Sequence, residues 1–335
     1  MYFPVSGVEA NPFILLMAAF VIALVTAPAG ISGAFLLLPF QVSVLGFAGP
    51  AVSPTNLIYN VVAIPGGVWS YVKERRMVWP LTWVIALGTL PGVFIGAVLR
   101  VTYLSDPRAF KAFVGLVLLY LGSRQLYTAV AHLIEGRRAL ARHGSGRQQE
   151  IGTYNEPLVG VSGTLHRGDT VRPGAFSLKK IEYEFGGRSI SFATVPVLLL
   201  SLGVGVVGGI YGIGGGSIMA PFLVTVLGLP VYTVAGAALM GTLLTSVAGV
   251  ACFQALAATG IGVQSMVAPD WSLGLILGAG GLVGSYVGAR TQKFLPETFI
   301  KLVLGALITL LSLGYLADSS GITLAGIRAW EWTYP

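Results

Sequence analysis

Two glycine-containing stretches are the part of this chain best suited to bind an anion. The second, Tyr211–Gly228, reads YGIGGGSIMAPFLVTVLG and has glycine at four of the five positions from 212 to 216. Within a helix, glycine costs about 1 kcal/mol relative to alanine, and a proline such as Pro221 costs about 3 kcal/mol. The stretch is therefore predicted to break a helix and to expose backbone N–H groups, which form a positive pole that suits an anion.

The first stretch, Ala29–Phe47, repeats this pattern at a constant offset of 182 residues. AGISGAFLLLPFQVSVLGF aligns with YGIGGGSIMAPFLVTVLGL, so that Gly30 falls on Gly212 and Pro39 falls on Pro221. Later segments also correspond, since PGVFIGAVL echoes VGSYVGART. The chain therefore consists of two related halves, each with one break, and the two breaks are expected to face each other around one site.

Polar side chains that could complete the site lie close to the breaks or on the segments that follow them. Asn56 and Asn60 are four residues apart and share one face of a helix. Amides and hydroxyls donate hydrogen bonds to an oxyanion without the cost of burying a full charge. The predicted substrate-binding residues are Gly30, Ser32, Gly33, Asn56, Asn60, Gly212, Gly214, Gly215, Gly216, Ser217, Thr242, Thr245 and Ser246. Weaker candidates are Gln41, Gln254 and the deeply placed Arg124.

Other interpretations of these residues stay open. The glycines could serve close packing between intact helices, and the polar side chains could simply hold helices together. Arg124 could extend to the membrane interface instead of acting as a counter-charge. A nucleotide-phosphate loop is disfavoured, because no GKS or GKT follows the glycines and the G-x-G-x-x-G pattern fails at Ser217.

Residue types that carry enzymatic or metal chemistry are not arranged for it. All thirteen acidic residues lie in termini, in loops or near the ends of apolar segments, so none is expected to relay protons at mid-membrane. The three histidines make no ligand set, and the single cysteine, Cys252, lies in an apolar run. We therefore expect no catalytic residue, no metal site and no cofactor.

The composition predicts a membrane protein. Hydrophobic residues make up 55% of the 335, charged residues only 10%, and residues 10–72, 77–99 and 190–269 contain no charged side chain. About 20 apolar residues suffice to cross the bilayer as a helix, so each long run must hold crossings. The net charge of +7 lies in loops between the spans, so the expected partner is the lipid bilayer and not nucleic acid.

Apolar runs and helix breakers predict ten segments. In the first half they are 12–27, 33–47, 53–72, 78–99 and 109–134; in the second they are 194–210, 216–229, 232–258, 271–290 and 297–317. The first two of each half are short for a bilayer crossing and are expected to be half-helices or a re-entrant pair. The expected domains are a first transmembrane repeat at 1–136, a polar insert at 137–189, and a second repeat at 190–335.

Basic residues predict the orientation of the two halves. KERR at positions 73–76 and Arg137 at the start of the insert should be cytoplasmic, which also places the insert at 137–189 in the cytoplasm. In the second half the basic residues Arg290 and Lys293 occur one loop later, as expected if the halves are inserted upside down relative to each other. The alternation around Gly186 and Gly187 predicts a β-hairpin, with a partly ordered linker as the alternative.

These motifs resemble the sulfite exporter TauE/SafE family of membrane permeases. The resemblance is carried by GIGGGSIMAPFLVTVLGLP, GISGAFLLLPFQVSVLG and PGVFIGAVL, and it covers both halves but neither the insert nor the termini. It implies transport of small anions, including sulfite, sulfonates and other sulfur-containing or organic acids. This chain departs from the pattern at Ser32 and Ala34, where the second half has glycines, and in the length of its insert.

The sequence therefore predicts an all-α polytopic membrane protein of two inverted repeats, each a broken pair of short helices plus three full transmembrane helices. The expected function is a secondary transporter of the bacterial inner membrane that moves sulfite, or another sulfur oxyanion or organosulfonate, by alternating access. An anion channel lined by the same breaks, or a membrane-anchored receptor or scaffold acting through the insert, remain alternatives. A coupling ion, Na⁺ or H⁺, and a homo-oligomer are compatible with the pattern, which leaves the direction of transport open.

Overall fold

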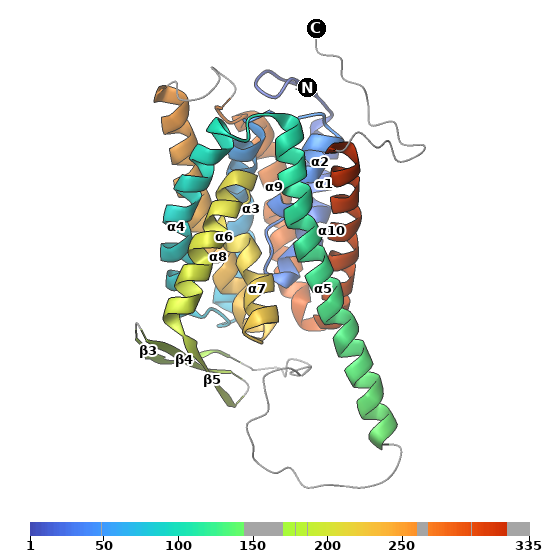
Figure 1. Ribbon diagram of the computed structural model, residues 1–335, viewed down its shortest axis with the longest axis vertical. Helices are drawn as coiled ribbons and strands as arrows, with labels where there is room; N and C mark the ends of the chain where they lie inside the picture. The colour runs from blue at the N-terminus through green and yellow to red at the C-terminus, as the bar shows by residue number, and fades with distance from the viewer. Residues whose placement is uncertain are drawn as a thin grey trace.

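The computed structural model describes residues 1–47, 49–143, 170–177, 179–185, 187–259, 267–295 and 297–319. Within these ranges ten α-helices form an elongated bundle that carries a small sheet at one end (Figure 1). Six stretches are long and apolar enough to cross a membrane, as in a multi-pass membrane protein. They are Pro12–Ala29, Trp79–Thr102, Arg108–Ala131, Thr194–Tyr211, Val231–Thr259 and Trp271–Phe294.

The first half contains the five helices that the sequence predicts. Asn11 caps the first of them by accepting a hydrogen bond from the Phe13 N–H at 3.0 Å, and Pro12 occupies the first turn, where it loses no helical hydrogen bond. The helices are α1 (Pro12–Thr26), which continues as the 3₁₀ turn η1 (Ala27–Ala29), α2 (Ala34–Ser43), α3 (Val52–Lys73), α4 (Trp79–Thr102) and α5 (Pro107–His143).

The second half contains the corresponding five. Asp270 caps one of them through the Leu273 N–H at 3.0 Å. The elements are α6 (Thr194–Tyr211), the 3₁₀ turn η2 (Gly215–Ile218), α7 (Met219–Val226), α8 (Val231–Thr259), α9 (Trp271–Thr291), the 3₁₀ turn η3 (Gln292–Phe294) and α10 (Glu297–Ser319).

Only the second helix of each half is clearly too short to cross a bilayer. Helix α2 has 10 residues and α7 has 8, whereas Pro12–Ala29 and Thr194–Tyr211 each have 18 and count as candidate spans. The first helix of each half thus has nearly the predicted length, but it counts as a candidate span and not as the half-helix that we expected. Helix α3 has 22 residues but is not among the six spans, because it carries polar residues such as Asn56 and Asn60.

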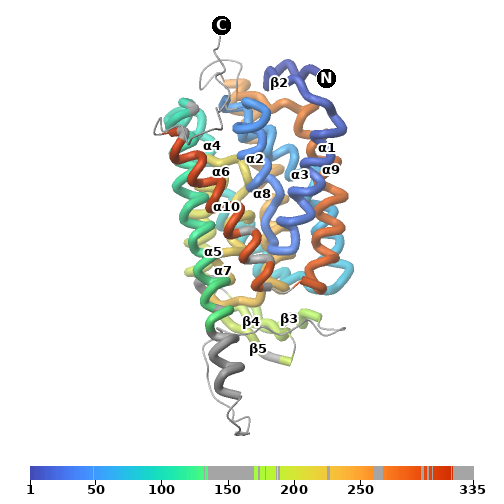
Figure 2. Tube along the Cα trace, turned by 90° about the vertical axis from the view of Figure 1, so that its right-hand side faces the viewer, coloured from blue at the N-terminus to red at the C-terminus, as the bar shows by residue number. Residues whose placement is uncertain are grey.

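Helices of one half pack mainly on helices of the other. Helix α4 packs on α6, and α9 packs on α1, while α3 packs on both α8 and α9, and α8 also packs on α4. Helices α5 and α10 lie side by side at one edge of the bundle and run in opposite directions (Figures 1 and 2). Exchanging the two halves converts the α1–α9 pair into the α6–α4 pair and leaves α3–α8 and α5–α10 unchanged.

The described part of the insert forms an antiparallel sheet of β3 (Arg172–Phe176), β4 (Lys180–Phe185) and β5 (Arg188–Ala193). Strands β4 and β5 pair in register from Lys180↔Ala193 to Phe185↔Arg188, which confirms the predicted hairpin. The sheet buries Ile181, Tyr183 and Ile190 at the end of the bundle where α6 begins. Helix α5 continues to His143, beyond residue 136, and residues 144–169 lie outside the described residues. A second, two-stranded sheet pairs β1 (Tyr2–Phe3) with β2 (Val8–Glu9).

Candidate functional site

Both predicted helix breaks are present. Gly30 ends η1 with φ 71°, and Gly212 ends α6 with φ 76°. Gly214 also has a positive φ, 75°, directly before η2. These left-handed conformations favour glycine, because a Cβ atom would crowd the backbone. The glycines at these three positions are therefore required by the backbone of the breaks.

Each break packs on the beginning of a long helix from the other half. A Cβ atom added at Gly30 would lie 2.4 Å from the Cα of Ala235 on α8, and one added at Gly212 would lie 2.4 Å from the Cα of Ser53 on α3. Ser53 and Ala235 are themselves equivalent at the offset of 182 residues. The same backbone contact is thus made twice, with the two halves exchanged.

The Asn60 side chain on α3 joins the two breaks. The Ser32 hydroxyl, in the first break, donates a hydrogen bond to Asn60 Oδ1. Asn60 Nδ2 donates to the carbonyl oxygen of Ile213, in the second break, at 2.9 Å and to Ser246 Oγ on α8 at 3.1 Å. At 1.5 Å per residue Asn60 lies about 12 Å along a helix of about 33 Å, and its side chain is fully buried. Four of the segments singled out by the sequence therefore meet at one amide inside the bundle.

The first turns of both short helices direct N–H groups at hydroxyl oxygens. The Ala34 N–H, at the start of α2, donates to Ser32 Oγ at 3.2 Å. The Gly215 N–H, at the start of η2, donates to Thr245 Oγ1 at 3.1 Å. Helix N-termini carry partial positive charge and bind anions well. In each break a neutral hydroxyl oxygen therefore occupies an acceptor position of the kind that an oxyanion oxygen fills.

Thr242 and Thr245 of α8 lie beside the second break and also bond within their own helix. Ser217 Oγ donates to the Ile213 carbonyl at 2.8 Å and lies 3.4 Å from Thr242 Oγ1. Thr242 and Thr245 each donate to a carbonyl one turn back in α8, at 2.8 Å. These threonines therefore present their oxygens to the break as acceptors, with their protons directed along the helix.

Asn56 lies one turn from Asn60 and holds α2 against α3. Its Nδ2 donates to the Ala34 carbonyl at 2.9 Å, and its Oδ1 accepts from Gln41 Nε2 at 3.2 Å. The side-chain oxygen of Gln41 is buried without a hydrogen-bond partner. In this conformation the side chain of Asn56 bonds one helix to another, which is the alternative interpretation given for the polar residues. Gln41 places an acceptor without a hydrogen-bond partner close to the first break.

Three further glycines allow neighbouring helices to approach the backbone of the breaks closely. A Cβ atom at Gly33 would lie 2.1 Å from the Tyr59 hydroxyl oxygen, and one at Gly215 would lie 2.3 Å from Thr89 Cβ. At Gly216 the nearest atom would be the Ala238 carbonyl oxygen, also at 2.3 Å. The packing explanation of the glycines thus holds at these positions, beside the conformational one at Gly30, Gly212 and Gly214.

Two weaker candidates lie away from the breaks. Arg124 lies partly exposed on α5, where its guanidinium is 6.0 Å from the centre of the Tyr120 ring. Gln254 is partly buried on α8, more than two turns beyond Ser246. The structure therefore does not bring Arg124 to the site as a counter-charge, because α5 packs mainly on α10 and α7 and not on α3 or α8.

Sequence reasoning missed Arg100, which is fully buried near the end of α4, one residue beyond the predicted segment 78–99. Its Nε donates to Ser53 Oγ at 3.2 Å, and its guanidinium also donates to the Gly49 and Leu104 carbonyls. The guanidinium carbon lies 3.8 Å from the centre of the Phe110 ring. The signal was present, since Arg100 is the first charge after an uncharged stretch that extends over residues 77–99.

Arg100 supports the second break through Ser53, whose hydroxyl donates to the Ile210 carbonyl of α6 at 3.2 Å. The alignment of PGVFIGAVL with VGSYVGART places Gln292 opposite Arg100. Gln292 Nε2 donates to the Pro28 carbonyl at 2.7 Å, and its Oε1 accepts from Arg76 Nη1 at 2.5 Å. The carbonyl end before each break is therefore linked, through one intervening side chain, to a guanidinium.

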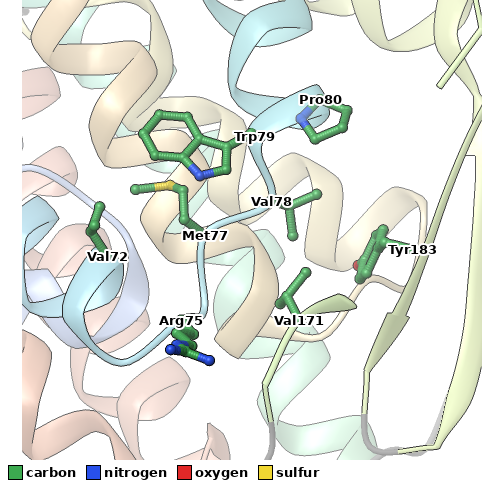
Figure 3. A pocket seen from close by; sticks show the side chains of 8 residues that line it. All are labelled: Val72, Arg75, Met77, Val78, Trp79, Pro80, Val171 and Tyr183. Atoms are coloured by element: carbon green, nitrogen blue, oxygen red, sulfur yellow. The ribbon is translucent and has the colours of Figure 1, made fainter. Parts of the chain in front are cut away.

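The candidate site is closed in this conformation. Ser32, Asn56, Asn60, Ser217 and Thr242 are all buried. An apolar pocket of about 620 Å³ lies between α5, α6 and α7, and a pocket of about 260 Å³ lies between the sheet and the loop that joins α3 to α4 (Figure 3). Neither is lined by a predicted site residue. In the described part of the chain, no group of three His, Cys, Asp or Glu residues could hold a metal ion.

Comparison with known proteins gives one match. Residues 15–315 match the model of the family described as Sulfite exporter TauE/SafE. This range covers both halves and the insert between them. No curated protein and no solved structure matches the chain.

Proposed function

Because the chain belongs to the sulfite exporter TauE/SafE family, we propose that it is a secondary transporter that moves sulfite, or another small sulfur oxyanion or organosulfonate, across the membrane. The observation that carries the proposal is the Asn60 side chain, which joins both helix breaks inside the bundle. A ligand that replaced these hydrogen bonds would contact both halves of the protein at once. Contact with both halves is what a transporter needs to couple binding to motion.

The proposed binding mode uses uncharged donors. An oxyanion between the breaks would take the acceptor positions of Ser32 Oγ and Thr245 Oγ1, and so receive the N–H groups of Ala34 and Gly215. Asn60 Nδ2 would supply a further donor. An oxyanion with several oxygens matches donors that converge from different elements. Arg100, linked to the second break through Ser53, would add positive potential without contacting the ligand.

The proposed mechanism is alternating access by two inverted repeats. Three observations support it: the α1–α9 and α6–α4 pairs exchange between the halves, α5 and α10 run in opposite directions, and Gly30 and Gly212 make equivalent contacts. The fully buried site corresponds to an occluded state, from which movement of one half against the other would open either side. The broken backbone is tolerated because protein surrounds it.

The proposed location is the bacterial inner membrane, with the sheet in the cytoplasm. The sheet and the KERR loop lie at the same end of the bundle, where the Val171 N–H donates to the Arg75 carbonyl at 3.0 Å. Positively charged loops favour the cytoplasmic side. Coupling to Na⁺ or H⁺ and assembly into a homo-oligomer are part of the proposal and need their own measurements.

Transport in proteoliposomes tests the proposal. We expect saturable sulfite uptake and counterflow, and an increase in the apparent Tm of the purified protein with sulfite concentration. Asn60→Ala should abolish both effects, whereas Gln254→Ala, which removes an amide of α8 away from the breaks, should preserve them. Sulfite flux without counterflow would support the anion channel instead. Full transport by Asn60→Ala would contradict the proposed site.

A further inference from the structure

The pocket between the sheet and the α3–α4 loop combines one cation with apolar walls. It has a volume of about 260 Å³. Val171 and Tyr183 line it from the sheet, and Arg75, Met77 and Trp79 line it from the loop and the start of α4 (Figure 3). The remaining lining residues are two valines and a proline. A pocket of this composition suits a ligand with a compact apolar body and one negative group.

Arg75 is the cation of this pocket and has no carboxylate partner among the described residues. The adjacent Glu74 is occupied, since Arg76 Nη2 lies 2.5 Å from its Oε2 and Lys293 Nζ lies 3.8 Å from its Oε1. The Arg75 backbone is fixed on both sides: its N–H donates to the Val72 carbonyl, and its carbonyl accepts from the Val171 N–H, each at 3.0 Å. These bonds fix the backbone of Arg75 at the pocket, while its exposed guanidinium remains available to a ligand.

The backbone of Arg75 is in a conformation that normally favours glycine. Its φ is 53°, and it is the non-glycine residue with positive φ in the described part of the chain. Together with the Arg76 N–H donating to the Tyr71 carbonyl at 3.0 Å, this forms a Schellman-type end to α3, in which glycine is usual at the left-handed position. A non-glycine residue in the left-handed region is a starting point for a hypothesis of function, and the position of Arg75 at the pocket supplies one.

Beside Arg75, the pocket has the Trp79 indole N–H and the Tyr183 hydroxyl as polar groups, and the hydroxyl is already paired. The Tyr183 hydroxyl is 2.8 Å from Thr233 Oγ1, so Tyr183 presents mainly its ring to the pocket. We propose that this pocket binds a small organic anion with one acidic group and a compact apolar body, such as an aromatic carboxylate, and that its occupancy regulates transport. The second part of this proposal rests on the proposed transport function, whereas the first part does not.

Residues that line the pocket contact the part of α8 on which the first helix break packs. Met77 packs in a small buried cluster with Ala235, the residue of α8 on which Gly30 rests. A Cβ atom at Gly236 would lie 3.4 Å from Met77 Sδ. Thr233, which Tyr183 holds, lies in the same first turn of α8. A ligand that ties the sheet to the α3–α4 loop would therefore restrain the part of α8 that faces the first break.

Binding is tested on the full-length purified protein with benzoate as the probe and benzyl alcohol as its uncharged analogue. We expect benzoate to raise the apparent Tm and benzyl alcohol to have a smaller effect. Arg75→Gly should weaken benzoate binding by about tenfold or more, because a charge-assisted hydrogen bond is lost. This variant also relieves the left-handed strain, so it should fold at least as well as the parent protein. Arg108→Gln, which removes an exposed guanidinium at the other end of the bundle, is the matched control and should bind benzoate normally.

Two results would overturn the site. Benzoate binding that is unchanged in Arg75→Gly would show that the guanidinium is not used. Benzoate binding that survives in Arg75→Gly but disappears in Asn60→Ala would place the probe in the transport site. Partial retention of binding in Arg75→Lys would support the site, since the positive charge is kept without the guanidinium geometry.

Regulation is tested separately in proteoliposomes. We expect benzoate on the sheet side to change the rate of sulfite transport in the parent protein and to have no effect in Arg75→Gly, which should transport sulfite at the parent rate without benzoate. Benzoate binding without any effect on transport would overturn the regulatory part. If no sulfite transport is found in the parent protein, the proposed function fails, and the binding experiment still decides whether the pocket is an anion site.

Discussion

The two helix breaks share one backbone plan but differ in how they are filled. Each has a left-handed glycine, Gly30 or Gly212, resting on an equivalent residue of the opposite half. The first break then uses a side chain, Ser32, which bonds to Asn60, where the second uses Gly214 with φ 75°. The equivalent positions carry the same packing requirement but different polar chemistry. The backbone of the site is therefore symmetric between the two halves, whereas its hydrogen-bonding side chains are not.

The supports of the two breaks differ as well. The second break is linked to the buried Arg100 through Ser53, whereas the first has the uncharged Gln292 at the equivalent place, with Arg76 behind it. The Gly30 contact lies on α8 close to Thr233, which bonds to Tyr183 of the sheet. The equivalent position on the other side, residue 51, is an alanine. The two breaks can therefore respond differently to the same movement.

The largest expected effect tests the shared backbone. Gly30→Val and Gly212→Val should each destabilise the protein by about 4 kcal/mol, because overpacking against Ala235 or Ser53 adds to the cost of a left-handed β-branched residue. Thermal unfolding of the purified variants in detergent measures this loss. Tolerance of one substitution but not the other would show that the two contacts are not equivalent.

The next largest effect compares the side chains that support the two breaks, Arg100 and Gln292, by the stability lost when each is replaced. Arg100→Gln should cost about 3 kcal/mol, since it removes charge-assisted hydrogen bonds and the contact with the Phe110 ring. Gln292→Leu should cost about 1 kcal/mol, because a neutral hydrogen bond to the Pro28 carbonyl is lost. The same unfolding assay compares them. Equal losses would mean that the charge of Arg100 adds nothing to the second break.

A smaller difference in stability is expected between Gly214 of the second break and Ser32, the residue at the equivalent position of the first. Gly214→Ala should destabilise by about 2 kcal/mol, because the new Cβ would have a positive φ and lie 2.7 Å from Ser246 Oγ. Ser32→Ala should cost about 1 kcal/mol through the lost hydrogen bond to Asn60. Unfolding and sulfite binding are measured for both. Because the anion is proposed to take the place of Ser32 Oγ and to receive the Ala34 N–H, Ser32→Ala should still bind sulfite; loss of binding would show that the hydroxyl itself contacts the anion.

The smallest effect concerns the bond between the sheet and the first turn of α8, near the Gly30 contact. Tyr183→Phe should cost about 1 kcal/mol by removing the bond to Thr233. Burial raises the pKa of Tyr183 to about 12, although the hydrogen bond with Thr233 opposes the shift. Its neutral form is therefore favoured in the folded state, and the stability it contributes is complete below about pH 10 and is lost as the pH rises to about 12. Unfolding of the parent and Tyr183→Phe across this range should converge; a constant difference would exclude ionisation of Tyr183 as the cause.

Much of the site was predictable because its signals are local. Runs of apolar residues fix where helices can cross a bilayer, and glycine clusters fix where they break, so the ten helices and both breaks lie close to their predicted positions. The hairpin of β4 and β5 follows from short-range alternation in the same way. Asn60 was a candidate because it shares one helix face with Asn56 and an amide can donate hydrogen bonds to an oxyanion.

The sequence by itself determined the membrane class, the two related halves, the breaks and the polar residues near them, since each depends on residues adjacent in the chain. Only the tertiary structure decided that Asn60 joins both breaks, that Arg100 is buried and Arg124 is not, and that Asn56 bonds to Ala34 and Gln41. These facts depend on contacts between helices far apart in sequence. Helical periodicity places a residue on a face, but which helix covers that face is set by packing of the whole bundle.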